Sequence, residues 1–205
     1  MTAQFALWAF VQSYGSEYLN VIAWDMVVPP QCYEELADRT IWLLKASKPV
    51  CHNTALRTYQ EHTGSFPDIW FTMDDDFILG IGCLLALEAV LNEDTNIGLA
   101  SVWNCGSQKN KGHLKMVAGE QVQFGDGFTV GGAIHAIPRR TLERVGLYDE
   151  SRPRHEDSKM TLDVRSSGMD AVIIRSRYAV EIPWDGEDPG YRQWLLDMNE
   201  ESKPT

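Results

Sequence analysis

Short apolar runs alternate with stretches of helical spacing along most of the chain. Runs rich in aromatic and β-branched residues predict strands at 4–12, 19–25, 68–73, 97–103, 131–137 and 170–175. Apolar positions three and four residues apart predict helices at 30–47, 53–62, 84–93, 138–146 and 156–168, with Asn53 as the N-cap of the second. This alternation predicts an α/β fold with a mostly parallel central sheet flanked by helices.

Two segments depart from the alternation. Residues 104–130 are rich in Gly, Lys, Asn and Gln, which favours loops and a hairpin. The segment PWDGEDPG lies near the C-terminus and is typical of irregular structure. With 205 residues and 44% hydrophobic content, the chain can bury one good core. We therefore expect one domain at 1–180 and an irregular tail at 181–205 that packs on the site or covers it.

Net charge and the length of the apolar stretches disfavour two classes of function, general nucleic-acid binding and membrane spanning. The 29 acidic and 18 basic residues give a formal charge of -11, which disfavours general nucleic-acid binding. A local basic patch remains open, at Arg139, Arg140 and Arg144 or at Lys109, Lys111 and Lys115. The apolar stretches are too short to span a bilayer, and the N-terminus does not have the pattern of a secretion signal. These features predict a cytoplasmic protein without a membrane span.

Three adjacent aspartates, Asp74 to Asp76, follow the strand predicted at 68–73. In open α/β sheets, ligands bind beyond the carboxyl ends of the strands. Carboxylates this close raise one another's pKa unless a cation or backbone N–H groups offset their charge. Hard oxygen ligands suit Mg²⁺ or Mn²⁺, which can also bridge substrate phosphates. The triplet therefore indicates either a metal site or a solvated acidic turn.

A second acidic site opens the helix predicted at 156–168. Glu156 and Asp157 there can favour the helix dipole, as acidic residues in a first turn commonly do. Alternatively, a carboxylate across a cleft from a metal-bound phosphate can act as general base toward an acceptor hydroxyl. The sequence leaves both interpretations open.

Three motifs in this order resemble the family 2 glycosyltransferases of GT-A fold. They are DDDFIL, GGAIHAIPRRTLERVGLYDE and HEDSKMTLDVRSSGMDAVI, and the resemblance covers roughly residues 50 to 175. It implies a metal-dependent transferase that moves a sugar from a nucleotide-sugar donor to an acceptor hydroxyl, with inversion of the anomeric centre. The cofactor would be Mn²⁺ or Mg²⁺. The acceptor would be a glycan or another hydroxyl compound, and a nucleic-acid acceptor is disfavoured by the net charge.

The resemblance also implies roles for individual residues. Asp157 would be the catalytic base, with Glu156 beside it on the acceptor. Asp76 and Asp74 would hold the metal. The donor site would comprise Asp74, Asp75, Asp76, Arg57, Asn53 and Asp25, and the acceptor side Gly131, Gly132, Ala133 and His155.

The N-terminal part departs from the family pattern, because only residues 16–19 separate AFVQSYG, which would hold the first turn, from NVIAWD, which would be the second strand. The usual helix does not fit there, so the nucleobase contacts beyond Asp25 are not assigned. Two other functions remain open: a nucleotidyltransferase acting on a sugar phosphate, and a catalytically silent domain that binds nucleotide sugars. Retention of both DDD and ED in one chain favours the glycosyltransferase.

Overall fold

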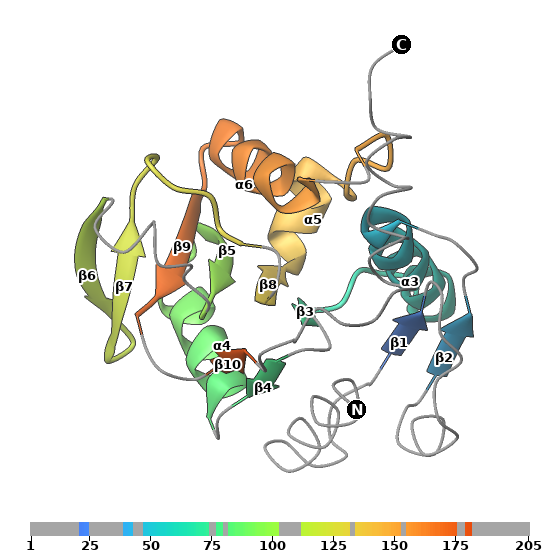
Figure 1. Ribbon diagram of the computed structural model, residues 1–205, viewed down its shortest axis with the longest axis horizontal. Helices are drawn as coiled ribbons and strands as arrows, with labels where there is room; N and C mark the ends of the chain where they lie inside the picture. The colour runs from blue at the N-terminus through green and yellow to red at the C-terminus, as the bar shows by residue number, and fades with distance from the viewer. Residues whose placement is uncertain are drawn as a thin grey trace, which may run out of the picture.

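A mixed six-stranded sheet forms the centre of the protein (Figure 1). The computed structural model describes residues 21–24, 39–42, 47–73, 77–79, 82–102, 112–131, 134–152, 155–175 and 179–181. The strands of the sheet, in spatial order, are β3 (Ile69–Met73), β8 (Ile134–Pro138), β5 (Ile97–Ser101), β9 (Asp170–Ile174), β7 (Glu120–Phe124) and β6 (His113–Val117). The α/β class predicted from the sequence is confirmed.

The prediction of a mostly parallel sheet is wrong. Among the described strands of this sheet, β5 and β9 form the one parallel pair, and the other neighbours are antiparallel. The antiparallel pairs arise because the described part of residues 102–130 contains the antiparallel hairpin of β6 and β7 in place of a single crossover helix between β5 and β8. Strand β8 then lies between β3 and β5 and runs opposite to both. Alternation along the sequence does not reveal which strands become neighbours.

Helices cover both faces of the sheet. Along β9, Val172 and Ile174 belong to a core cluster with α4 (Cys83–Glu93), whereas Ala171 and Ile173 belong to a second cluster. The second cluster includes residues of α3 (Lys48–Thr63), α5 (Arg139–Val145) and α6 (Glu156–Ser166). Because successive strand residues point to opposite faces, α4 lies on one face and the other three helices contribute to the opposite one. Three layers result.

Two short strand pairs accompany the main sheet. Strand β1 (Val21–Trp24) pairs in parallel with β2 (Arg39–Trp42), and β4 (Phe77–Leu79) pairs antiparallel with β10 (Ala179–Glu181). The helix predicted at 30–47 is therefore wrong at β2, where Thr-Ile-Trp suits a strand. The strand predicted at 4–12 and most of the tail, 182–205, lie outside the described residues, and the division at residue 180 stays a prediction.

Local chemistry explains two element boundaries. Helix α3 begins at Lys48 rather than at the predicted Asn53, because Pro49 in the first turn suits a helix start and leaves Asn53 in the helix interior. The hairpin expected within 104–130 is present as β6 and β7. Its two connecting residues, Ala118 and Gly119, have φ of 51° and 79°. Positive φ at both central residues is typical of the tight turns that join antiparallel strands.

The basic cluster considered for a nucleic acid has structural contacts. The Arg140 guanidinium donates to the carbonyls of Leu91, Thr95 and Ile97 at 2.7 to 3.0 Å, which closes the C-terminus of α4. Arg139 pairs with Asp68 at 2.8 Å. Arg140 therefore has a structural task, whereas the buried Nε of Arg139 has no hydrogen-bond partner among the described residues. A nucleic-acid contact at this cluster stays a prediction that the net charge disfavours.

We predict that Gly98→Ala destabilises the fold. A Cβ at this position in β5 would lie 2.9 Å from Val164 Cγ1 and 3.0 Å from both Met169 Cβ and Thr141 Oγ1. Overpacking of this kind costs about 1–3 kcal/mol in free energy of unfolding. Urea unfolding followed by circular dichroism measures the loss. The exposed Ser166→Ala serves as the control, and equal midpoints for the two variants would contradict the close packing of β5 against α5 and α6.

Candidate functional site

The carboxyl end of β3 meets the amino end of β8. Met73 pairs with Ile134 in the antiparallel register, and the sequence continues from Met73 into Asp74. Ile134 follows the small-residue motif Gly131, Gly132 and Ala133 in the sequence, and Gly131 is partly exposed. The strand residue that precedes the triplet, Met73, and the strand residue that follows the small-residue motif, Ile134, are therefore neighbours in the sheet. Residues Asp25, Asp74, Asp75, Asp76, Gly132 and Ala133 lie outside the described residues, and their roles stay predictions.

Helix α6 is fastened to this same end of the sheet. The Val130 N–H donates to Thr161 Oγ1 at 3.2 Å, and the Val130 carbonyl lies 3.2 Å from His135 Nε2. Thr161 belongs to α6 and His135 to β8, so the backbone of one residue, Val130, connects the two elements. His135 pairs with Thr72, two residues before Asp74. These contacts connect α6, which carries the acidic pair, to β8 and through it to β3, the strand that precedes the triplet.

The acidic pair occupies the first turn of α6, as predicted. Glu156 Oε1 lies 3.6 Å from Lys48 Nζ, and its side chain is only 11% exposed. Asp157 Oδ1 accepts from the Ser158 N–H at 2.6 Å and from the Ser158 hydroxyl at 3.3 Å. The preceding His155 is exposed and has a left-handed backbone, with φ of 61°. The contacts hold both carboxylates in place, which is compatible with a catalytic role and with a stabilised helix start.

Asn53 and Arg57 tie α3 to the loop after α5. The Asn53 amide donates to the Tyr148 carbonyl and to Glu150 Oε1, each at 2.8 Å, and accepts from the Tyr148 N–H at 2.9 Å. Arg57 pairs with the same Glu150 oxygen at 2.9 Å, and its side chain is 52% exposed. Asn53 is buried, so these bonds give it a structural task. The donor roles of both residues stay predictions, and Arg57 has the more accessible charge.

Two histidines beneath the site were missed by the sequence reasoning. The His52 ring packs on the Tyr148 ring at 4.8 Å between centroids, and His135 Nδ1 lies 3.4 Å from the Tyr148 hydroxyl. Burial lowers the pKa of His135 to about 4, helped by Lys48 and opposed by its Val130 bond and by Asp157. Burial also lowers the pKa of His52, with Lys48 and His135 adding to the effect. In the sequence, His135 could have been noticed as the single polar residue of the otherwise apolar strand IHAIP.

Polar atoms without partners lie next to these histidines. Among the residues that the structure describes, Thr72 Oγ1 and Trp70 Nε1 are buried and have no hydrogen-bond partner. Both belong to β3, and Thr72 lies opposite His135. The Trp70 ring lies 6.5 Å from the His52 ring. Buried polar groups in folded proteins are usually satisfied, so these two side chains set this part of β3 apart from purely apolar core.

The described residues contain no group of three His, Cys, Asp or Glu side chains placed to hold a metal ion. The carboxylates of the predicted ligands, Asp74 and Asp76, have the donor chemistry that Mg²⁺ and Mn²⁺ prefer. A metal would therefore depend on the triplet, with substrate oxygens as the remaining ligands. In the described part of the chain, no helix is both long and apolar enough to cross a membrane.

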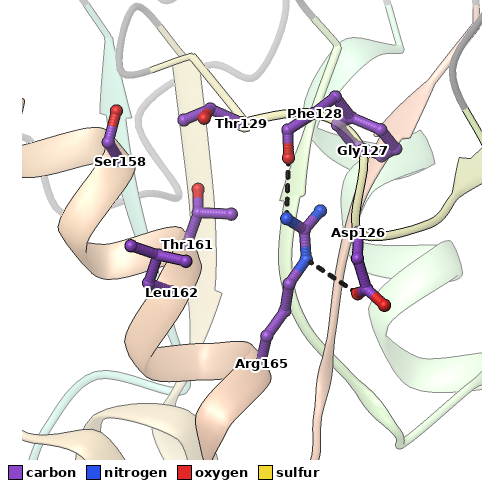
Figure 2. A pocket seen from close by; sticks show the side chains of 8 residues that line it. All are labelled: Asp126, Gly127, Phe128, Thr129, Ser158, Thr161, Leu162 and Arg165. Atoms are coloured by element: carbon purple, nitrogen blue, oxygen red, sulfur yellow. Dashed lines mark hydrogen bonds and ion pairs between the residues drawn. The ribbon is translucent and has the colours of Figure 1, made fainter.

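A pocket of about 240 Å³ lies between α6 and the loop 126–129 (Figure 2). Ser158, Thr161, Leu162 and Arg165 line it from the helix. Ser158 is the residue directly after Asp157, so the pocket begins beside the acidic pair. The sequence does not reveal this pocket, because the composition of residues 126–129 indicates only an irregular excursion.

No protein-family model and no curated protein sequence matches the chain. Among solved structures, it is similar to the mannosyltransferase PcManGT from Pyrobaculum calidifontis, solved with GDP-Man and Mn²⁺, at TM-score 0.64 and 15% identity. The match covers 100% of this chain and 62% of the mannosyltransferase chain. CMP:2-keto-3-deoxy-manno-octonic acid synthetase, solved with CTP, matches at TM-score 0.49 and 14% identity, covering 97% and 88% of the two chains. The first similarity shows that this chain has a GT-A-like fold.

We predict that acid destabilises the protein through His135. Its pKa of about 4 lies below the ordinary value near 6.5, so the unfolded chain takes up the proton first as the pH falls. This contribution to stability is complete above about pH 6.5 and is lost toward pH 4, by about 3 kcal/mol in all. Unfolding in urea at several pH values measures the slope.

The variant His135→Gln keeps an amide that can donate to the Val130 carbonyl and cannot titrate. It should flatten the slope of stability between pH 6.5 and 4, leaving the part that His52 contributes. Equal slopes for His135→Gln and the unmodified protein would show that His135 is not held neutral by the fold.

Proposed function

We propose that the protein is a metal-dependent glycosyltransferase that moves a sugar from a nucleotide-sugar donor to an acceptor hydroxyl with inversion. One observation supports the proposal: hydrogen bonds connect α6, which carries the acidic pair, to β8, and β8 is the neighbour of the strand β3 that precedes the triplet. The contacts run from Thr161 on α6 through Val130 to His135, which pairs with Thr72 on β3 just before the triplet. The GT-A-like fold and the two ligands of the similar mannosyltransferase, GDP-Man and Mn²⁺, support this function.

In this mechanism Asp157 is the general base. Its carboxylate takes the proton of the acceptor hydroxyl while the acceptor oxygen forms a bond to the anomeric carbon of the donor sugar. The bond from that carbon to the diphosphate oxygen breaks with its electron pair, and a nucleoside diphosphate leaves. The Ser158 N–H and hydroxyl, at 2.6 and 3.3 Å from Asp157 Oδ1, fix the orientation of the base. Glu156 would contact the acceptor while Lys48, at 3.6 Å, partly offsets its charge.

The donor side of the site is proposed from the sequence. Asp74 and Asp76 would hold Mn²⁺ or Mg²⁺, which supplies positive charge to the diphosphate when bound. Asp75 and Asp25 would contribute to the donor pocket. Arg57 would reach the diphosphate if it left Glu150, a partly exposed pairing of the kind that contributes at most about 1 kcal/mol.

The acceptor side lies at the start of β8 and α6. Gly131, Gly132 and Ala133 have small or absent side chains, which would leave room for a sugar beside the strand. His155 would border the same space, because it directly precedes the acidic pair and is exposed.

We predict that Asp76→Asn abolishes metal-dependent nucleotide binding while the fold persists. The substitution removes a negative charge and leaves the shape of the side chain nearly unchanged. Thermal shift with nucleoside diphosphates, with and without Mn²⁺, measures the loss, since a ligand that binds the native state raises the melting temperature. The exposed Glu88→Gln on α4 is the control. Unchanged Mn²⁺-dependent stabilisation in Asp76→Asn would remove the metal role from the triplet.

We predict that Asp157→Asn lowers turnover by at least about a hundredfold, the usual effect of losing a general base. Donor and metal binding should persist, because Asn keeps the shape and loses only the basicity. Asp163→Asn, on the same helix and paired with Lys159, is the matched control. Turnover is followed by release of nucleoside diphosphate.

The configuration of the product tests the same mechanism. NMR of the anomeric proton should show inversion. Retention, or normal turnover by Asp157→Asn, would leave the acidic pair as a helix start alone. Release of pyrophosphate from a nucleoside triphosphate and a sugar phosphate would instead identify a nucleotidyltransferase.

A further inference from the structure

We propose that the pocket between α6 and the loop 126–129 is an acceptor subsite that binds one neutral, hydroxyl-rich sugar ring (Figure 2). The proposal rests on the proposed function, and it names the acceptor class as a glycan. Nucleic acid and charged acceptors are not expected to occupy this pocket.

The walls of the pocket are held before any ligand binds. Arg165 donates from Nη1 to the Phe128 carbonyl and from Nη2 to the Gly125 carbonyl, each at 2.7 Å. Thr161 holds Val130 at the other end of the loop, at 3.2 Å. Figure 2 shows Arg165 rising from α6 to the loop at Phe128, with Asp126 beside it. A loop fastened at both ends loses little freedom on binding, which favours recognition of a small ligand.

The charge of the pocket favours a neutral ligand. The guanidinium of Arg165 is directed to backbone carbonyls, and its Nε lies 3.7 Å from Asp126 Oδ1. The positive charge is therefore offset, and few donors remain for a phosphate or a carboxylate. The other polar side chains among the lining residues are those of Ser158, Thr129 and Thr161, and the Thr161 hydroxyl is bonded to the Val130 backbone. Hydroxyls and a carboxylate can both accept from sugar hydroxyls, and hydroxyls can also donate to them.

The size of the pocket and its rim fit a single ring. A volume of about 240 Å³ is below the roughly 300–1,000 Å³ of pockets for drug-sized ligands. The Leu162 side chain is 59% exposed and that of Asp126 is 97% exposed, so the rim is open to solvent. An exposed leucine beside hydroxyl groups offers an apolar surface to the C–H face of a sugar.

The position of the pocket connects it to the proposed chemistry. Ser158 lines the pocket, and its hydroxyl lies 3.3 Å from Asp157 Oδ1. A ring in the pocket would therefore place one of its hydroxyls, or that of the next sugar, beside the proposed base. An acceptor sugar in this pocket would thus approach Asp157 along the surface of α6.

The test is a titration of the full chain with methyl α-D-mannopyranoside, methyl β-D-glucopyranoside and methyl β-D-galactopyranoside, followed by saturation-transfer NMR. At least one glycoside should bind. In Leu162→Trp the indole would fill the pocket, and the affinity should fall by at least about tenfold. In Asp126→Asn the loss of the carboxylate acceptor should weaken binding several-fold. Leu85→Trp, at an exposed leucine on the opposite face of the sheet, should leave the affinity unchanged.

The proposal is overturned if no glycoside binds the unmodified protein, if Leu162→Trp binds as well as Leu85→Trp, or if inorganic phosphate displaces the bound glycoside. Thermal shift with nucleoside diphosphates and Mn²⁺, on the same samples, separates this result from the proposed function. If Leu162→Trp loses glycoside binding and no sample binds a nucleotide, the result supports the subsite and contradicts the transferase. Nucleotide binding with glycoside affinity unaffected by Leu162→Trp supports the transferase and contradicts the subsite.

Discussion

The insertion of β8 between β3 and β5 is the constraint on which the candidate site depends. An antiparallel neighbour brings its amino end to the carboxyl end of the strand beside it, so Met73 lies opposite Ile134. The strand residues next to two motifs that lie nearly sixty positions apart in the sequence thereby become neighbours at one end of the sheet. If β8 ran parallel to β3, the small-residue segment would lie at the opposite end of the strands, away from the triplet.

Polar contacts beneath this edge then position the helices. Val130 is bonded to Thr161 of α6 and to His135 of β8, and the Tyr148 backbone is bonded to Asn53 of α3. Such buried bonds contribute modestly to net stability, but breaking one leaves an unsatisfied group that costs more. They therefore fix the relative positions of α3, α6 and the sheet more strictly than apolar packing alone would.

The distribution of charge around the site matches its proposed chemistry. Cationic side chains near it are largely paired, as Lys48 is with Glu156, Arg57 with Glu150, and Arg165 with Asp126 and backbone carbonyls. With a formal charge of -11, the chain has little general attraction for polyanions. A bound cation at the triplet would supply the positive charge that a diphosphate needs, while the pocket beside α6 stays suited to neutral groups.

The sequence by itself determined the α/β class, most helices and strands of the described region, and the acidic pair at the start of α6, because periodicity and helix-start chemistry are local. It failed at Arg39–Trp42, where pairing with β1 outweighed helical spacing. It also failed for the N-cap assigned to Asn53, which lies inside α3 with hydrogen-bond partners 95 and 97 positions away. Strand order, the neutral His135 and the pocket beside Ser158 were decided only by the tertiary structure. Each depends on contacts between distant segments, which no local pattern encodes.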